Sequence, residues 1–122
     1  MDAVNRGDLD AVMSFYLPDA LWESPPLGTS FAGVAAIRGF HEDWLGAHED
    51  YEIHTEEILD LDNGVVLAVI RQNARPVGST GHVQTRMAVT SESEDSKVAR
   101  VTVYYDIDEA RAAAERLAEE RE

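Results

Sequence analysis

The sequence predicts an α+β domain in which helices precede a curved antiparallel sheet and a further helix closes the chain. Three observations carry this prediction. Apolar residues recur at helical spacing up to residue 47, strand-like segments follow between residues 51 and 107, and an alanine stripe among Arg/Glu pairs ends the chain. Strands that follow one another without helices between them form an antiparallel meander. A length of 122 residues, 44% of them hydrophobic, fits one domain over residues 1–122.

Two helices and a short strand are predicted before residue 50. Ala3 and Val4 look like the tail of a helix that is broken at Gly7, so we expect the first helix to be truncated. Residues 8–16 carry apolar side chains at i, i+3, i+4 and i+7, and Pro18 ends this short amphipathic helix. Residues 20–24 alternate briefly and predict a strand. Residues 34–47 predict a longer helix.

The second half of the chain predicts the sheet. Four strand segments are expected, at residues 51–61, 65–74, 82–91 and 97–107. Asn63-Gly64 is the clearest hairpin signal. Strand 65–74 is apolar on both faces through Ile70, so we expect helices to cover one face and a second copy of the chain to cover the outer face as a homodimer. The last helix begins near Asp106.

Composition excludes several classes of function. A formal charge of −14 opposes binding to nucleic acid or to an anionic membrane. The longest apolar run, residues 65–70, is far shorter than the ~20 residues that span a bilayer. Residues 1–6 have neither a basic start nor an apolar stretch, so we expect no secretory signal and a cytoplasmic protein. Without cysteine there is no disulfide or thiolate chemistry. His41 and His48 are too far apart on one helix for a single ion, and we expect no metal or other cofactor.

Three blocks of the chain resemble the nuclear transport factor 2 superfamily. They are residues 3–10 (AVNRGDLD), 19–23 (DALWE) and 33–40 (GVAAIRGF), and residues 97–106 resemble the last strand of its SnoaL-like branch. The resemblance implies a cone, in which a bent sheet wraps around the N-terminal helices and leaves an apolar cavity open at one end. Members include ketosteroid isomerases, scytalone dehydratase, limonene epoxide hydrolases, SnoaL-like polyketide cyclases and proteins without catalysis, so the fold alone does not give the chemistry.

The catalytic residues of two of these activities are missing from this sequence. Ketosteroid isomerase carries its general-base aspartate where this chain has Ser24, and its oxyanion acid falls near Ala88. A serine hydroxyl cannot take a proton unaided near neutral pH, and alanine has nothing to donate. The epoxide hydrolases use an Arg and an Asp two residues apart on one strand beside a second Asp, and no predicted strand shows that spacing. We therefore rank cyclase-like proton transfer first.

Asp106 is the main catalytic candidate, because it matches the acid/base aspartate of SnoaL-like cyclases. An aspartate more than half buried at a cavity mouth could move a proton beside a carbonyl group. The alternative is a capping box with Glu109, in which Asp106 accepts hydrogen bonds from the last helix. Alignment with the isomerase points Arg86 into the cavity as an oxygen anchor, and His82 could exchange protons. Both could instead be solvated.

A second set of residues is predicted to form the cavity wall and bind substrate. Its members are Tyr16, Trp22, Ser24, Phe40, Trp44, Gln72 and Tyr105. The aromatic members could equally be core residues that need no ligand. We therefore predict a cofactor-independent cyclase, isomerase or dehydratase that acts on an apolar oxygenated metabolite. The alternatives are a non-catalytic small-ligand-binding or dimerisation protein of the same fold, and an epoxide hydrolase of the limonene type.

Overall fold

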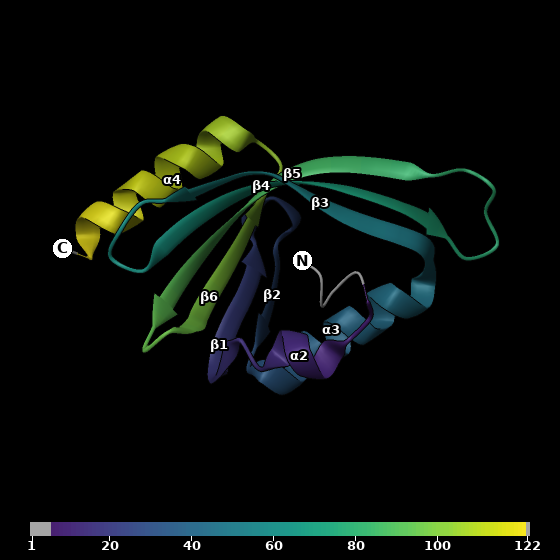
Figure 1. Ribbon diagram of the computed structural model, residues 1–122, viewed down its shortest axis with the longest axis horizontal. Helices are drawn as coiled ribbons and strands as arrows, with labels where there is room; N and C mark the ends of the chain where they lie inside the picture. The colour runs from purple at the N-terminus through teal and green to yellow at the C-terminus, as the bar shows by residue number, and fades with distance from the viewer. Residues whose placement is uncertain (1–5, 122) are drawn as a thin grey trace.

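The chain is built around one strongly curved sheet (Figure 1). The computed structural model describes residues 6–121, so the predicted helix tail before Gly7 lies outside the described residues. Its elements are α2 (Leu9–Met13), β1 (Tyr16–Ser24), the 3-10 turn η1 (Pro25–Leu27), β2 (Thr29–Ala32), α3 (Val34–Ala47), β3 (His48–Asp60), β4 (Val65–Pro76), β5 (Val83–Glu94), β6 (Lys97–Tyr104) and α4 (Ile107–Glu120). Within the described range, no helix has the length and apolarity needed to cross a membrane.

The predicted α+β order is confirmed, with one correction to the sheet. The strands lie in the order β2-β1-β6-β5-β4-β3, and all neighbours are antiparallel except one pair. β1 runs parallel to β6, with Trp22 opposite Val101. The prediction of a wholly antiparallel sheet is therefore wrong at this pair. The rest of the fold separates β1 from β6, so no short hairpin imposes an antiparallel direction on them.

The first predicted helix is shorter than its periodicity indicates. The pattern covers residues 8–16, but α2 ends at Met13 and β1 already begins at Tyr16. The carbonyl of Phe15 accepts a hydrogen bond from the backbone N–H of Val98, at 2.8 Å, so the chain has joined the sheet by that point. Pairing with β6 therefore satisfies backbone groups that a longer helix would have paired internally. By contrast, α3 has the bounds that the sequence predicts.

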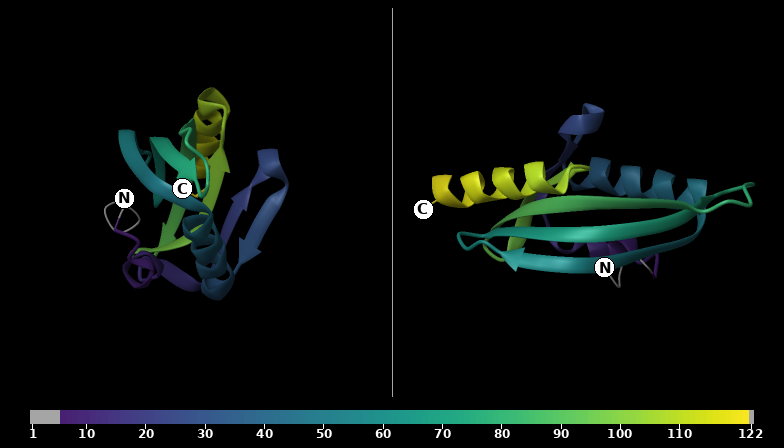
Figure 2. Two further views of the ribbon diagram at one scale, coloured as in Figure 1. Left: turned by 90° about the vertical axis from the view of Figure 1, so that its right-hand side faces the viewer. Right: turned by 90° about the horizontal axis from the view of Figure 1, so that it is seen from above.

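Helices cover the two faces of the sheet separately. Figure 1 shows α4 on one side of the strands and α2 with α3 on the other, and in the left view of Figure 2 the sheet curls from β3 to β2 around α3. Under α4 the contact is filled by small and medium apolar residues. These buried residues are Val65, Leu67 and Ala88 of the sheet and Ala110, Ala114 and Ala118 of the helix.

Both ends of α4 are tied to the rest of the molecule. At its start, a carboxylate oxygen of Asp106 accepts a hydrogen bond from the backbone N–H of Glu109, at 3.0 Å. At its end, the amide of Asn63 donates to a carbonyl of the last turn at 2.7 Å. Arg121 donates to the backbone carbonyls of Asn63 and Ser93, each at 2.8 Å. The helix is thereby attached to both long hairpins of the sheet.

The position of α4 explains why β4 is apolar on both faces. Val65 and Leu67 are at most 1% exposed because the chain's own last helix covers them. We expected a second copy of the chain on this outer face. The apolar pattern that motivated the expectation is accounted for by α4, and the homodimer stays a prediction.

Candidate functional site

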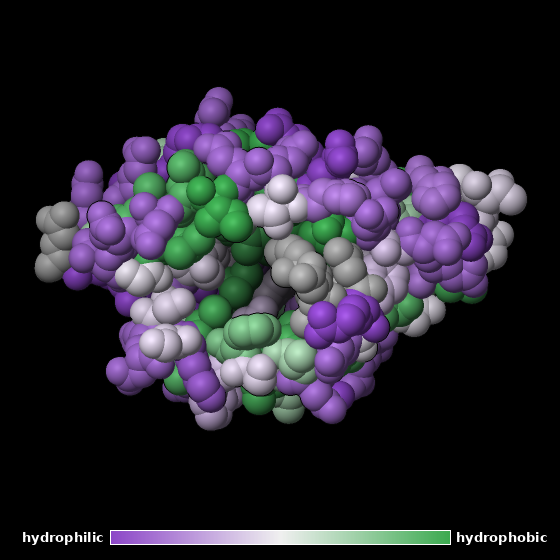
Figure 3. Space-filling model, in the orientation of Figure 1, coloured by the Kyte–Doolittle hydropathy of each residue, from purple (hydrophilic) through white to green (hydrophobic). Residues whose placement is uncertain are grey.

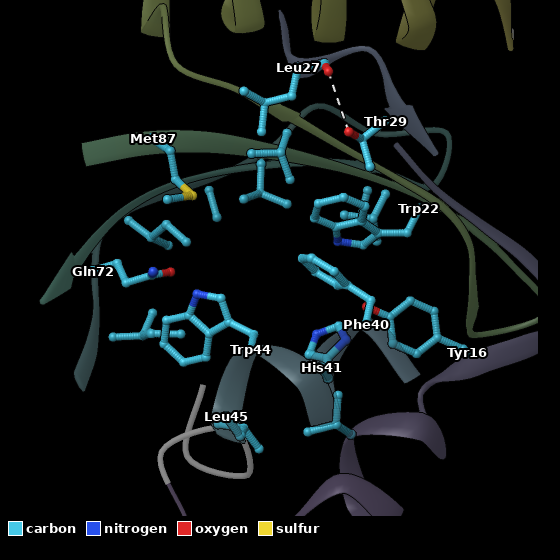
Figure 4. A pocket seen from close by; sticks show the side chains of 18 of the residues that line it. Tyr16, Trp22, Leu27, Thr29, Phe40, His41, Trp44, Leu45, Gln72 and Met87 are labelled. Carbon is cyan, nitrogen blue, oxygen red and sulfur yellow. Dashed lines mark hydrogen bonds between the residues drawn. The ribbon is translucent and has the colours of Figure 1, made fainter. Parts of the chain in front are cut away.

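A pocket of about 460 Å³ lies between the concave face of the sheet and the helices α2 and α3. Figure 4 looks into it, and Figure 3 shows a hollow bordered by hydrophobic residues on this side of the molecule. Alternate residues of three strands point into the pocket because side chains of a strand alternate between its faces. They are Val66, Ala68, Ile70 and Gln72 of β4, Met87, Val89 and Ser91 of β5, and Val101 and Val103 of β6, which Tyr105 follows.

Aromatic side chains form much of the opposite wall. Phe40 and Trp44 are one turn apart on α3 and therefore face the sheet together. The ring of Phe40 lies 4.5 Å from that of Trp22 and 4.8 Å from that of Phe31, measured between centroids. Trp44 stacks on His48 at 4.5 Å. These contacts hold the large rings in place around the pocket, so the wall does not depend on a ligand for its shape.

The wall carries polar groups that are neutral near pH 7. Four of the residues that line the pocket are Tyr16, Trp22, Trp44 and Gln72. The polar groups of their side chains make no hydrogen bond to another described residue. Burial raises the pKa of Tyr16 to about 12, so its phenol keeps its proton. Among the described residues that line the pocket, none is Asp, Glu, Lys or Arg. Over residues 6–121, no group of three or more potential ligands gathers where it could hold a metal ion.

His41 is a wall residue that sequence reasoning missed. We considered it with His48 as a metal pair, yet it faces the pocket from α3. Its Nδ1 lies 2.9 Å from the carbonyl oxygen of Ile37, and its ring meets Phe40 edge-on at 5.4 Å. The signal was available, because His41 precedes Trp44 by three residues and therefore shares its side of the helix. By sequence alone, the neighbouring Glu42 and Asp43 favour a solvated position for His41.

The structure places all but one of the predicted substrate-binding residues on this wall. The residues on the wall are Tyr16, Trp22, Phe40, Trp44, Gln72 and Tyr105. The exception is Ser24, which is fully buried and whose hydroxyl donates to the carbonyl of Val103 at 3.2 Å. Ser24 thus joins the end of β1 to β6 and does not line the pocket.

The expectation that Asp106 is buried at the cavity mouth is wrong. Asp106 is exposed, and its side chain accepts the hydrogen bond from Glu109 described above. This hydrogen bond confirms the alternative, in which Asp106 caps the last helix. The physical reason is that the first turn of α4 has backbone N–H groups without helical partners, and the aspartate just before it satisfies one of them.

The orientation expected for strand β5 is also wrong. Arg86 lies on the face opposite Met87, with its side chain 59% exposed and paired with Glu56 at 2.6 Å. Ala88, on the same face as Arg86, is buried under α4. His82 is exposed and precedes the strand. Alternation defines two faces of this strand, and the alignment with the isomerase assigned them in reverse.

The pocket opens where two exposed residues border it. Leu27 of η1 is 60% exposed and Tyr105 is 43% exposed, yet both line the pocket. Residues that belong to a cavity wall and also reach solvent mark its mouth. An apolar side chain and a phenol thus border the mouth of the pocket.

The family model of the SnoaL-like domain matches residues 1–101, which leaves α4 outside the match. No curated protein matches this sequence. Among solved structures, a Catenulispora acidiphila protein with a ketosteroid isomerase-like fold, in complex with trimethylamine, is similar to this chain. Its TM-score is 0.77 at 13% identity, and the match covers 86% of this chain and 80% of that chain.

Two further structures are similar over most of their length. A Mycobacterium tuberculosis protein in complex with estradiol-17β-hemisuccinate has a TM-score of 0.74 at 14% identity, and the match covers 88% of each chain. A Sinorhizobium meliloti protein described as a candidate polyketide cyclase has a TM-score of 0.70 at 24% identity, over 84% of this chain and 86% of that chain. At these identities the likeness shows the fold.

Proposed function

The chain belongs to the SnoaL-like domain family, and from that premise we propose that it binds an apolar, uncharged, oxygen-bearing small molecule in its cavity. The observation that carries this proposal is the wall itself, whose described residues include no formally charged side chain except His41 when protonated. A charged ligand group would lose hydration there without gaining an ion partner, at a cost of several kcal/mol. A neutral apolar molecule gains about 25 cal/mol for each Å² removed from water.

The size and the polar groups of the cavity support the same ligand class. A volume of about 460 Å³ falls in the range of roughly 300–1,000 Å³ typical of small-molecule sites. The indole N–H groups of Trp22 and Trp44 and the amide of Gln72 can each bind a ligand oxygen. The estradiol-17β-hemisuccinate complex of the Mycobacterium tuberculosis neighbour supports the apolar ring system alone, because the hemisuccinate carries a carboxylate.

Catalysis by cofactor-independent proton transfer stays a prediction. Its sequence-based residues are Asp106, His82 and Arg86, and none of these three lies on the cavity wall. Binding is therefore the function that the geometry supports best. Loss of turnover of a bound molecule in Asp106→Asn, with an unchanged melting temperature, would favour the catalytic alternative.

Two fluorescent probes that differ by one charge test the proposal. N-phenyl-1-naphthylamine is neutral, and 8-anilinonaphthalene-1-sulfonate is the same molecule with a sulfonate. We expect saturable, one-site binding of the neutral probe and at least tenfold weaker binding of the anion, because the described wall residues offer the sulfonate no lysine or arginine. Equal affinities, or no saturable binding of the neutral probe, would contradict the proposal.

A pair of tryptophan substitutions locates the bound probe. Ala68 lines the cavity, and Ala112 is exposed on α4. Ala68→Trp should fill the cavity and remove binding of the neutral probe, whereas Ala112→Trp should leave it unchanged. Retention of binding in Ala68→Trp would place the probe elsewhere on the protein.

A further inference from the structure

The hydrogen bond of His41 determines which of its ring nitrogens carries the proton. Nδ1 lies 2.9 Å from the carbonyl oxygen of Ile37, one turn earlier on α3. A carbonyl oxygen only accepts hydrogen bonds, so Nδ1 must be the donor. In the neutral imidazole the other nitrogen, Nε2, therefore keeps its lone pair and acts as an acceptor. In the described part of the chain, the His41 ring makes no second hydrogen bond.

The polar side chains of this wall differ in whether they donate or accept hydrogen bonds. The indole nitrogens of Trp22 and Trp44 only donate, whereas Gln72 and Tyr16 can donate or accept. Figure 4 shows His41 below Phe40 on α3, with Trp44 and Gln72 toward the other side of the cavity. Among these five residues, His41 offers a ligand only an acceptor, whereas Trp22 and Trp44 offer only donors. A ligand that satisfies both needs a hydroxyl hydrogen for His41 and an oxygen acceptor for the indole or amide groups.

A ligand without an O–H or N–H donor leaves His41 unsatisfied. Once an apolar ligand displaces water from the cavity, an acceptor nitrogen without a partner bears the cost of its lost hydration. A site that is built to hydrogen-bond one ligand group therefore discriminates against analogues that lack the group more strongly than an apolar pocket does.

His48 shows that the bond to the preceding turn is not by itself a ligand site. Its Nδ1 lies 2.8 Å from the carbonyl oxygen of Trp44, in the same relation that His41 has to Ile37. Yet His48 is absent from the described residues that line the cavity. The two histidines share one local geometry, and tertiary structure brings His41 alone to the wall.

We infer that His41 selects ligands that carry a phenolic or enolic hydroxyl, because its Nε2 accepts a hydrogen bond from that hydroxyl. The inference rests on the proposed ligand-binding function and deepens it. Phenols and enols fit best because they are stronger hydrogen-bond donors than aliphatic alcohols. They are also largely uncharged near pH 7, as the wall requires. The ligand class of the protein is therefore an apolar, ring-containing molecule with one such hydroxyl and a second oxygen that accepts a hydrogen bond.

The experiment compares 2-naphthol with 2-methoxynaphthalene, which differ only in methylation of the hydroxyl. Both are measured by displacement of N-phenyl-1-naphthylamine from the wild type, His41→Phe and His48→Gln. We expect the ratio of the two affinities to shift about tenfold toward the ether in His41→Phe, the usual size of one hydrogen bond. His48→Gln should keep the wild-type ratio. Differences in hydrophobicity between the probes cancel because only the change in ratio is used.

Each other outcome has a defined meaning. An unchanged ratio in His41→Phe overturns the inference, and saturable binding of both probes then leaves the proposed function standing. If neither compound displaces N-phenyl-1-naphthylamine from the wild type, the inference is overturned and the proposed function still stands on the binding of that probe. If N-phenyl-1-naphthylamine itself shows no saturable binding, both are overturned. If the phenylalanine disturbs the cavity, so that both affinities fall, His41→Leu replaces it and the same ratio decides. A ratio that shifts equally in His48→Gln also overturns the inference.

Discussion

The two faces of the sheet are covered by helices in opposite ways. On one face, α4 presents alanines, so the helix approaches closely and buries Leu67 and Ala88 almost completely. On the other face, α3 presents Phe40 and Trp44, and a cavity of about 460 Å³ remains between helix and sheet. Small side chains let backbones pack to the density of a protein interior, whereas large rings hold the helix away from the sheet. One sheet thus supports a filled core on one face and a cavity wall on the other.

Substitutions that enlarge a side chain should distinguish the two faces of the sheet most clearly. Ala114 is fully buried between α4 and the sheet, and Ala68 lines the cavity. We expect Ala114→Leu to lower the free energy of unfolding by about 3 kcal/mol, because a filled core must be strained to admit it. Ala68→Leu should change stability little, since the cavity has room for the side chain, and it should weaken probe binding. Urea denaturation of both variants measures the difference. Equal losses would mean that the two faces are equally filled.

Removing volume should have the next largest effect. Val65 and Val66 are neighbours on β4, and Val65 is buried under α4 whereas Val66 lines the cavity. Val65→Ala should cost about 2 kcal/mol, from lost burial and from the void that remains. Val66→Ala should cost less than about 1 kcal/mol, because its side chain already borders empty space. A larger loss for Val66→Ala in denaturation experiments would contradict the contrast.

Two tyrosines on opposite faces should make stability fall at alkaline pH. Burial raises the pKa of Tyr16 to about 12. The pKa of Tyr104 is raised by burial and then by the carboxylates of Glu109 and Glu23. The folded state keeps a proton that the unfolded chain loses near pH 10, so stability is complete below that pH and falls as pH rises toward the folded pKa. For Tyr16 the loss reaches about 1.4 kcal/mol by pH 11.

Phenylalanine variants test this titration. Tyr16→Phe should remove the loss of stability that Tyr16 causes at alkaline pH, measured by urea denaturation at pH 9 and pH 11. Added salt should not change the size of this contribution. Tyr104→Phe should remove a second share that salt reduces, because part of it comes from neighbouring charges. An alkaline loss of wild-type size in Tyr16→Phe would show that its phenol is not buried as the structure has it.

The smallest expected effect concerns the helix start on the filled face. Asp106→Ala should destabilise the protein by about 1 kcal/mol, because an N–H group of α4 loses its acceptor. Asp106→Asn should be nearly neutral, since asparagine caps as well as aspartate does. Thermal denaturation measures both, and neither variant should alter affinity for the neutral probe. A change in that affinity would connect Asp106 with the cavity after all.

Local patterns in the sequence predicted the elements well wherever a single segment decides its own structure. Helix α3 has the bounds that its apolar spacing predicts. The hairpin after β3 forms at Asn63-Gly64, where both residues adopt the positive φ values that such a turn requires. The aromatic residues of α3 were likewise predicted at the wall, because residues four apart on a helix share one face.

Tertiary structure alone decided which face of each strand is the inner one. Alternation on β5 separates Arg86 from Met87, but either set could have faced the cavity. The outcome depends on α4, which covers Ala88 on one face and leaves the cavity to the other. The role of Asp106 follows from the same helix, whose first turn it caps. The spacing of apolar residues and the residues of a turn are local properties, which one segment specifies. Which face of a strand points into the cavity depends on contacts between segments far apart in the chain.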